Sequence, residues 1–262
     1  YRQQFSCSKT QASIGVNIMP KTVLVTGAAS GIGLASAKLL LQEGYQVMAF
    51  DPQEELMRHN LPEEDLISFF CGDISMSEDC SDAVALTVKT FGQLDALLHW
   101  GAAHSSKRWD ELDAEEFNNI MSVNVTGSFL IAQAAAGYMM AGDGGAIVLT
   151  TSTSVIFGAT GGNGQGGPAY VSSKGAIIAL NRSLARALAP KVRCNAVSPG
   201  LTETPMIGGM TKKLREDMTR RFPLGRFGIP DEIANAGLFL ISEKASFITG
   251  EVIHVNGGSN FN

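Results

Sequence analysis

A short strand, a glycine-rich turn and a helix follow one another within residues 22–44, and this unit constrains the fold more than any other part of the chain. Thr22–Thr26 is apolar and β-branched, as in a buried strand, and Leu34–Glu43 has the composition of a helix that stops at Gly44. Residues 27–33 between them read G-A-A-S-G-I-G. Glycines allow the backbone to approach a phosphate, and the N–H groups of a helix N-terminus favour an anion. The unit therefore predicts a phosphate-binding turn.

An acidic residue closes the next strand at the place where a ribose is expected. The strand Tyr45–Phe50 ends on Asp51, which stands 18 residues after Gly33. A carboxylate about 20 residues beyond such a turn accepts hydrogen bonds from an adenosine ribose, and it would repel a 2′-phosphate. No Lys or Arg follows until Arg58, and the turn itself carries Ser30 rather than a base. The pattern favours NAD over NADP; the alternative is a solvated acid in an ordinary turn.

Tyr170 and Lys174 form a second informative pair, four residues apart in the sequence. On a helix, this spacing places both side chains on the same face. A phenol with a pKa near ~10 is a poor acid or base at neutral pH, and a neighbouring ammonium lowers that pKa. The pair therefore predicts a proton-transfer device, although the same spacing also occurs by chance in many helices.

Taken together and in order, these segments resemble the short-chain dehydrogenase/reductase family over about residues 21–260. Residues 26–33 resemble its T-G-x-x-x-G-x-G cofactor loop, 170–174 its Y-x-x-x-K pair, and 199–204 its P-G-x-x-x-T segment at the nicotinamide. The resemblance implies four catalytic residues, Asn124, Ser152, Tyr170 and Lys174. It also implies an NAD site without a metal, formed by Gly27, Ser30, Gly31, Ile32, Gly33, Asp51, Asp73, Ile74, Gly101, Tyr170, Lys174, Pro199, Gly200, Thr202 and Thr204.

The family's chemistry assigns a role to each catalytic residue. Tyr170 is expected to act as general acid and base, Ser152 to polarise the substrate oxygen, and Lys174 to bind the nicotinamide ribose. Asn124 is expected to hold a water that links Lys174 to solvent, and Ser154 is the alternative to Ser152. The expected activity is hydride transfer between NAD(H) and a secondary alcohol or ketone. The alternatives are an NADPH-dependent carbonyl reductase and a non-catalytic NAD-binding protein.

Three segments depart from the family pattern. One is the stretch 150–154, T-T-S-T-S, whose several hydroxyls leave Ser154 as the alternative to Ser152. After the strand Ala96–His99, the usual N-N-A-G is replaced by H-W-G-A at 99–102. We interpret His99 as a structural histidine rather than a general base, and Trp100 as a packing residue. Residues 158–167 form a glycine-rich loop between Ser152 and Tyr170. This loop is expected either to shape the substrate entrance or to be a slack connector.

Short apolar strands alternate with helical stretches along the whole chain, including Leu66–Phe70, Ala146–Thr150, Val192–Val197 and Val252–Val255. This alternation predicts an α/β fold: a doubly wound, Rossmann-type parallel sheet with helices on both faces, in a single domain. The expected domain spans 19–262, with a substrate lid at about 201–223. Residues 1–18 are expected to be a leader, a tag or a disordered N-terminal extension. By family resemblance, the protein is expected to form a homotetramer or a homodimer.

Charge and cysteine content exclude several other classes. A net charge of −5 argues against a nucleic-acid partner. The four cysteines, of which Cys71 and Cys194 are expected in the core, show no C-x-x-C pair, and the four histidines show no H-E-x-x-H motif. Free thiols favour a reducing, cytoplasmic compartment. The sequence also predicts neither a membrane span nor a secretory signal.

Overall fold

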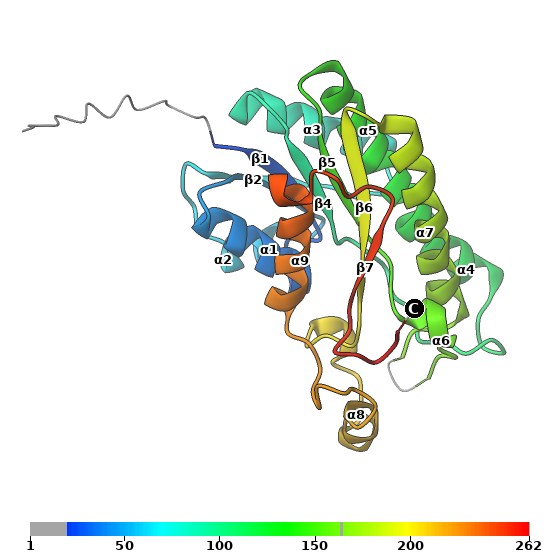
Figure 1. Ribbon diagram of the computed structural model, residues 1–262. Helices are drawn as coiled ribbons and strands as arrows, with labels where there is room; N and C mark the ends of the chain where they lie inside the picture. Colours follow the sequence, from blue (N-terminus) through cyan, green and yellow to red (C-terminus); the bar gives the residue numbers. More distant parts are fainter. Residues whose placement is uncertain (1–19, 163–164, 262) are drawn as a thin grey trace, which may run out of the picture.

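The computed structural model describes residues 20–162 and 165–261 of the 262-residue chain. Within them, one sheet contains seven parallel strands in the order β3-β2-β1-β4-β5-β6-β7 (Figure 1). The strands are β1 Thr22–Thr26, β2 Gln46–Asp51, β3 Ile67–Cys71, β4 Ala96–His99, β5 Gly145–Thr150, β6 Val192–Pro199 and β7 Val252–Val255. The strand order reverses between β1 and β4, and ligands of such sheets bind at the carboxyl ends of the strands beside this point.

Helices cover both faces of the sheet, as Figure 1 shows. The described helices are α1 Gly31–Gln42, α2 Glu54–Asn60, α3 Ser77–Phe91, α4 Ala114–Met121, α5 Ser128–Ala141, α6 Ser154–Phe157, α7 Pro168–Leu188, α8 Lys212–Thr219 and α9 Pro230–Ile241. Successive strand residues point to opposite faces. Leu24 accordingly packs with α3, α5 and α7, whereas Val23 and Val25 pack with α1 and α9. The two buried clusters keep the sheet rigid beneath its carboxyl edge.

The predicted fold is confirmed, with small shifts in the ends of the elements. The helix that was expected from Leu34 begins at Gly31, so the glycine-rich turn supplies its first residues. The strand expected at Leu66–Phe70 is moved by one residue and ends on Cys71. Cys71 is exposed, which corrects the expectation that it lies in the core, whereas Cys194 is buried. The extension expected at residues 1–18 lies outside the described residues.

One continuous helical run, Ala114–Ala141, comprises α4, a π-helical turn at Ser122–Gly127, and α5. By length and composition alone it is apolar enough to cross a membrane. Its buried residues, however, pack with α3, α7 and the sheet, as expected for a core helix. No cluster of His, Cys, Asp and Glu suited to a metal ion occurs in the described part of the chain.

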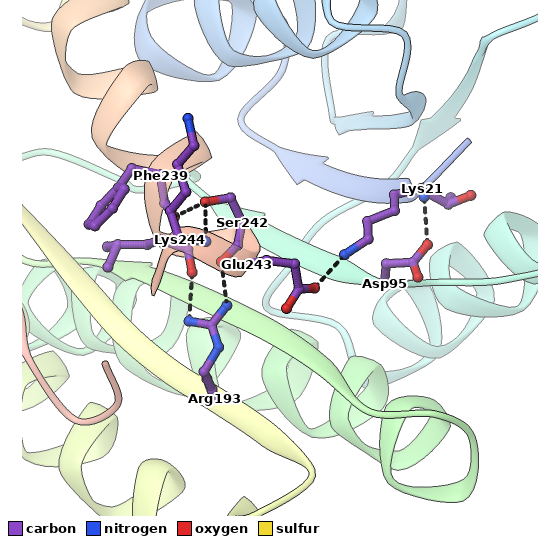
Figure 2. Close-up of polar contacts among 9 residues, drawn as sticks. Lys21, Asp95, Arg193, Phe239, Ser242, Glu243 and Lys244 are labelled. Atoms are coloured by element: carbon purple, nitrogen blue, oxygen red, sulfur yellow. Dashed lines mark hydrogen bonds and ion pairs between the residues drawn. The ribbon is translucent and has the colours of Figure 1, made fainter. Parts of the chain in front are cut away.

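Arg193 ties β6 to the C-terminal end of α9, at the sheet edge opposite the phosphate-binding turn (Figure 2). Its guanidinium donates to the carbonyl oxygens of Leu240 at 2.7 Å and Ser242 at 3.2 Å. The last carbonyls of a helix lack partners within the helix, and a cation there also complements the helix dipole. Lys21 adds an ion pair with Glu243 at 2.8 Å.

We expect Arg193→Met to lower the free energy of unfolding by about 1.5–3 kcal/mol, because it removes hydrogen bonds from a charged donor to partly buried carbonyls. The exposed Arg182 on α7 supplies a matched control, and Arg182→Met should stay within about 0.5 kcal/mol of the wild type. Urea unfolding of the three proteins measures both changes. Equal losses in the two variants would show that Arg193 has no specific capping role.

Candidate active site

The turn between β1 and α1 is shaped to receive an anion. Gly27 has φ +69°, and a Cβ there would lie 2.9 Å from the backbone nitrogen of Gly101, so only glycine fits. Ser30 is the N-cap residue of α1, and its side chain makes no capping hydrogen bond. No acidic side chain occupies the first turn of the helix. The first backbone N–H groups of α1 are therefore left for a ligand.

A cleft of about 480 Å³ opens along the carboxyl edge of the sheet beside this turn. It brings together residues that are far apart in the sequence. Every residue predicted for the site lines it except Asn124. The lining residues among those predicted are Gly27, Ser30, Gly31, Ile32, Gly33, Asp51, Asp73, Ile74, Gly101, Ser152, Tyr170, Lys174, Pro199, Gly200, Thr202 and Thr204.

Asp51 is buried at the end of β2 and holds the turn in place. Its carboxylate accepts hydrogen bonds from the backbone nitrogens of Ala29 at 3.2 Å and Gln53 at 3.0 Å. Arg58, the nearest base along the sequence, pairs instead with Glu54. Among the described residues that line the cleft, Lys174 is the sole Lys or Arg. The region around Asp51 therefore has no cation for a 2′-phosphate.

The proton-transfer groups lie at the other end of the cleft. Tyr170 and Lys174 are on α7, and Ser152 follows β5. Ser152 is hydrogen-bonded to the Tyr170 hydroxyl. The backbone nitrogen and the hydroxyl of Ser154 both donate to Ser152 Oγ, at 3.2 and 2.9 Å. Because the two lone pairs of Ser152 are thus occupied, its own proton is directed to the tyrosine oxygen or to a substrate oxygen.

Burial controls the protonation of Tyr170 and Lys174. It raises the pKa of Tyr170 to about 12, and the hydrogen bond from Ser152 opposes this rise. This direction is opposite to the lowering expected from Lys174, whose Nζ lies 5.7 Å from the centre of the tyrosine ring. Burial lowers the pKa of Lys174 to about 8, and its Nζ donates to the Thr150 carbonyl at 3.0 Å. At pH 7, Tyr170 is therefore neutral and Lys174 is mostly charged.

Asn124 lies in the π-helical turn and is fully buried. Its side chain exchanges hydrogen bonds with both backbone groups of Ala103, at 2.7 and 2.9 Å. It also donates to Ser173, the neighbour of Lys174, at 2.9 Å. The side chain therefore joins the segment after β4 to the helix that carries the Tyr–Lys pair. Its expected role in holding a water stays a prediction.

Comparison with known proteins agrees with this geometry. The family model described as enoyl-(acyl carrier protein) reductase matches residues 27–260. The FabG 3-oxoacyl-[acyl-carrier-protein] reductase of Thermotoga maritima is 33% identical over 243 residues, which cover 91% of this chain and 97% of the relative. The 3alpha-hydroxysteroid dehydrogenase of Mediterraneibacter gnavus is 34% identical over 248 residues, covering 91% and 96%. The chain belongs to the short-chain dehydrogenase/reductase family.

Solved structures of short-chain dehydrogenases/reductases show the same architecture. A member from Brucella melitensis described as a glucose/ribitol dehydrogenase has a TM-score of 0.87 at 33% identity, covering 92% of this chain and 97% of that one. A 3-ketoacyl-(acyl-carrier-protein) reductase from the same organism, complexed with NADH, has a TM-score of 0.84 at 30% identity, covering 92% and 98%. The protein is thus an oxidoreductase of the short-chain dehydrogenase/reductase type.

The segment in which this short-chain dehydrogenase/reductase departs from the family pattern contains a closed hydrogen-bond network. Ser128 Oγ donates to the Asn124 carbonyl at 2.6 Å, so it accepts the hydrogen bond from the N–H of His99 Nε2 at 2.8 Å. Thr26 Oγ1 accepts from the Gly101 nitrogen at 3.2 Å and donates to His99 Nδ1 at 2.7 Å. His99 therefore connects the cofactor turn to the helix of Asn124, which confirms its structural interpretation.

His99 and Trp100 are both part of the packed interior. Burial, together with the charge of Lys174, lowers the pKa of His99 to about 3, so the imidazole is neutral and is not poised as a general base at pH 7. Trp100 is buried and lies against α9, where a Cβ on Gly237 would come within 2.7 Å of the indole. The packing role predicted for Trp100 is confirmed.

The segment 201–223 lines the cleft on the substrate side and has a small core of its own. Ile207, Met210 and Met218 are buried together with Phe222 and Phe227. The charged side chains of this segment are not directed to a substrate; Arg215, for example, forms an ion pair with Glu203. No Lys or Arg of the segment lines the cleft. The segment thus presents an apolar surface to a substrate, and α8 extends beyond the sheet edge (Figure 1).

Several lining residues of the cleft were not predicted from the sequence, among them His104, Phe157 and Gln165. His104 lies on the loop after β4, and the other two lie on the connection between Ser152 and Tyr170. The described part of the glycine-rich loop is therefore a wall of the cleft rather than a slack connector; residues 163–164 lie outside the description. The sequence marks His104 only as a polar residue five positions after a strand end, which is a weak indication of a site residue.

Proposed function

We propose that the protein is an NAD-dependent oxidoreductase that interconverts a secondary alcohol and its ketone. The observation that carries the proposal is the meeting of Ser152, Tyr170 and Lys174 in the same cleft as the anion-binding turn and Asp51. Side chains for proton transfer lie at one end, and groups suited to a dinucleotide lie at the other. This combination argues against the alternative of a non-catalytic NAD-binding protein.

The residues of the cleft fit a nicotinamide dinucleotide. The open N-terminus of α1 suits its pyrophosphate, and Asp51 suits an adenosine ribose that bears no 2′-phosphate. Lys174, with protons of Nζ beyond the one given to Thr150, suits the nicotinamide ribose. When bound, the nicotinamide supplies a hydride donor or acceptor.

The chain's own residues then control the proton. In ketone reduction, the neutral Tyr170 hydroxyl gives its proton to the carbonyl oxygen as negative charge develops there. Ser152 donates a hydrogen bond to the same oxygen, and Ser154 orients Ser152 for this role. The Lys174 ammonium stabilises the phenolate that remains. In alcohol oxidation, the phenolate takes the proton back.

We expect NADH to bind at least about tenfold more tightly than NADPH, a difference of about 1.4 kcal/mol. Asp51→Asn should narrow this gap, because it removes the charge that repels a 2′-phosphate while keeping the size of the side chain. Asp65→Asn, at an exposed position outside the cleft, removes the same net charge and should leave the gap unchanged. Fluorescence titration at fixed salt measures all three proteins.

The titration, together with an activity assay, also tests the two alternative functions. Tighter binding of NADPH by the wild type would replace the proposal by an NADPH-dependent carbonyl reductase. Binding of NADH without turnover across a broad panel of alcohols and ketones would favour a non-catalytic binding protein. A cytoplasmic location, a homotetramer or homodimer, and a lid function for 201–223 stay predictions that accompany the proposal.

A further inference from the structure

The loop after β4 forms the wall of the cleft next to Tyr170, and polar contacts with α4 hold this wall in place. In the loop after β4, Ser105 and Lys107 both contact the Glu116 carboxylate on α4. The Ser105 hydroxyl also accepts from the Lys107 nitrogen at 3.3 Å. These polar groups therefore satisfy one another and build the wall, and they are not left for a ligand.

The glycine-rich loop fixes the same wall from the other side. Gly162 N donates to the Ser106 carbonyl at 2.6 Å, and Gly167 N donates to the Ser105 carbonyl at 2.8 Å. A Cβ on Gly161 or Gly167 would lie only 2.6 or 2.1 Å from the Lys107 carbonyl, so the approach requires glycine. The residue just before this anchored stretch, His104, is thereby held in place.

His104 lines the cleft and is half buried. Its ring meets the Tyr170 ring edge-on, with the ring centres 5.1 Å apart. Neither ring nitrogen has a hydrogen-bond partner in the described part of the chain. Burial lowers the pKa of His104, so at pH 7 the imidazole is neutral, with one N–H donor and one acceptor nitrogen.

The rest of this end of the cleft offers a substrate almost no charge. Its lining is dominated by apolar side chains: Phe157, Ala159, Met206, Ile207, Met210 and Met218. Charged side chains among the described lining residues are confined to Asp51 and Asp73 in the cofactor half, and to Lys174. The cleft therefore suits an uncharged, apolar molecule.

We propose that His104 is a specificity-determining residue that hydrogen-bonds a second oxygen on an otherwise apolar, uncharged alcohol or ketone. The inference rests on the proposed function, because it places the reacting oxygen at Ser152 and Tyr170. The second oxygen then lies on the side of the substrate that faces the His104 ring, whose centre is 5.1 Å from that of the Tyr170 ring. A preorganised imidazole in apolar surroundings discriminates for such an oxygen, since a substrate without it leaves the imidazole unpaired.

The kinetic test compares cyclohexanone with 4-hydroxycyclohexanone, which carries its second oxygen across the ring from the ketone. We expect the wild type to prefer the hydroxyketone by about tenfold in kcat/KM. His104→Phe keeps the ring contact with Tyr170 and should abolish the preference, whereas His104→Gln should retain part of it. His59→Phe, on the exposed face of α2, is the matched control and should behave as wild type.

A second measurement does not depend on turnover. The chain has only four histidines, so ¹⁵N-histidine labelling gives a simple spectrum in which His104 is assigned by its loss in His104→Phe. With NAD⁺ present, which has no hydride to give to a ketone, 4-hydroxycyclohexanone should shift the His104 ring nitrogens, and cyclohexanone should not. Equal preference in wild type and His104→Phe, or no selective shift, would overturn the inference. Absence of turnover with a selective shift would instead count against the proposed reaction alone.

Discussion

Replacement of Tyr170 by phenylalanine is expected to lower turnover by about 10²–10⁴-fold while NADH binding persists. The ring keeps its edge-on contact with His104 and its place beside Lys174, so the shape of the cleft is retained. What is lost is the hydroxyl that Ser152 orients and that exchanges a proton with the substrate oxygen. Steady-state kinetics with a ketone that the wild type reduces, together with an NADH titration, measures the two effects separately.

Tyr138 on α5 supplies the matched control, because its hydroxyl donates to the Gly92 carbonyl at 3.3 Å and the residue does not line the cleft. Tyr138→Phe should keep full turnover.

The wild type should also show a pH dependence of alcohol oxidation that the Tyr170→Phe variant lacks. With a Tyr170 pKa of about 12, the phenolate needed for alcohol oxidation grows about tenfold per pH unit below that value. Oxidation should therefore accelerate with rising pH up to about pH 8, where Lys174 begins to lose its charge. Unchanged turnover in Tyr170→Phe would remove Tyr170 from the mechanism.

The parts of the site that follow from local spacing were accessible from the sequence. The turn at 27–33 and the acid at Asp51 belong to one strand–turn–helix–strand unit, and Tyr170 and Lys174 are one helical turn apart. Such relations are set by helix and strand geometry and do not depend on distant packing. For the same reason, the seven strands were placed to within one or two residues, and the fold class followed from their alternation with helices.

The features of the site that depend on burial in the folded protein could not be predicted from the sequence. The Tyr170 pKa rises instead of falling, because removal of water outweighs the effect of a lysine whose ammonium is turned to Thr150. The position of His104 depends on a loop that is anchored by Glu116 and by the glycine-rich connection. Loop conformation of this kind is set by contacts between segments that are distant in sequence, and residue spacing does not encode it.

A single methyl group at Gly33 is expected to weaken NADH binding at least about 100-fold, or about 2.7 kcal/mol. Gly33 lies in the first turn of α1, and a Cβ there would lie 2.0 Å from the Gly27 carbonyl oxygen and 2.5 Å from its carbon. Both contacts are with backbone, so no side chain can yield; the turn itself must move. The anion-binding N–H groups then lose their arrangement, and overpacking also lowers stability by about 1–3 kcal/mol.

The same substitution in α5 should have the opposite outcome, which makes it a stringent control. At Gly137, no described atom other than those of its chain neighbours and of the surrounding helix backbone lies within 4 Å of the position that a Cβ would take. Gly137→Ala should therefore raise stability by about 0.5–1 kcal/mol through the better helix propensity of alanine, and leave NADH affinity unchanged. NADH titration and thermal unfolding of both variants test the pair. If Gly33→Ala retains wild-type NADH affinity, close packing of α1 on the turn is not what shapes the cofactor site.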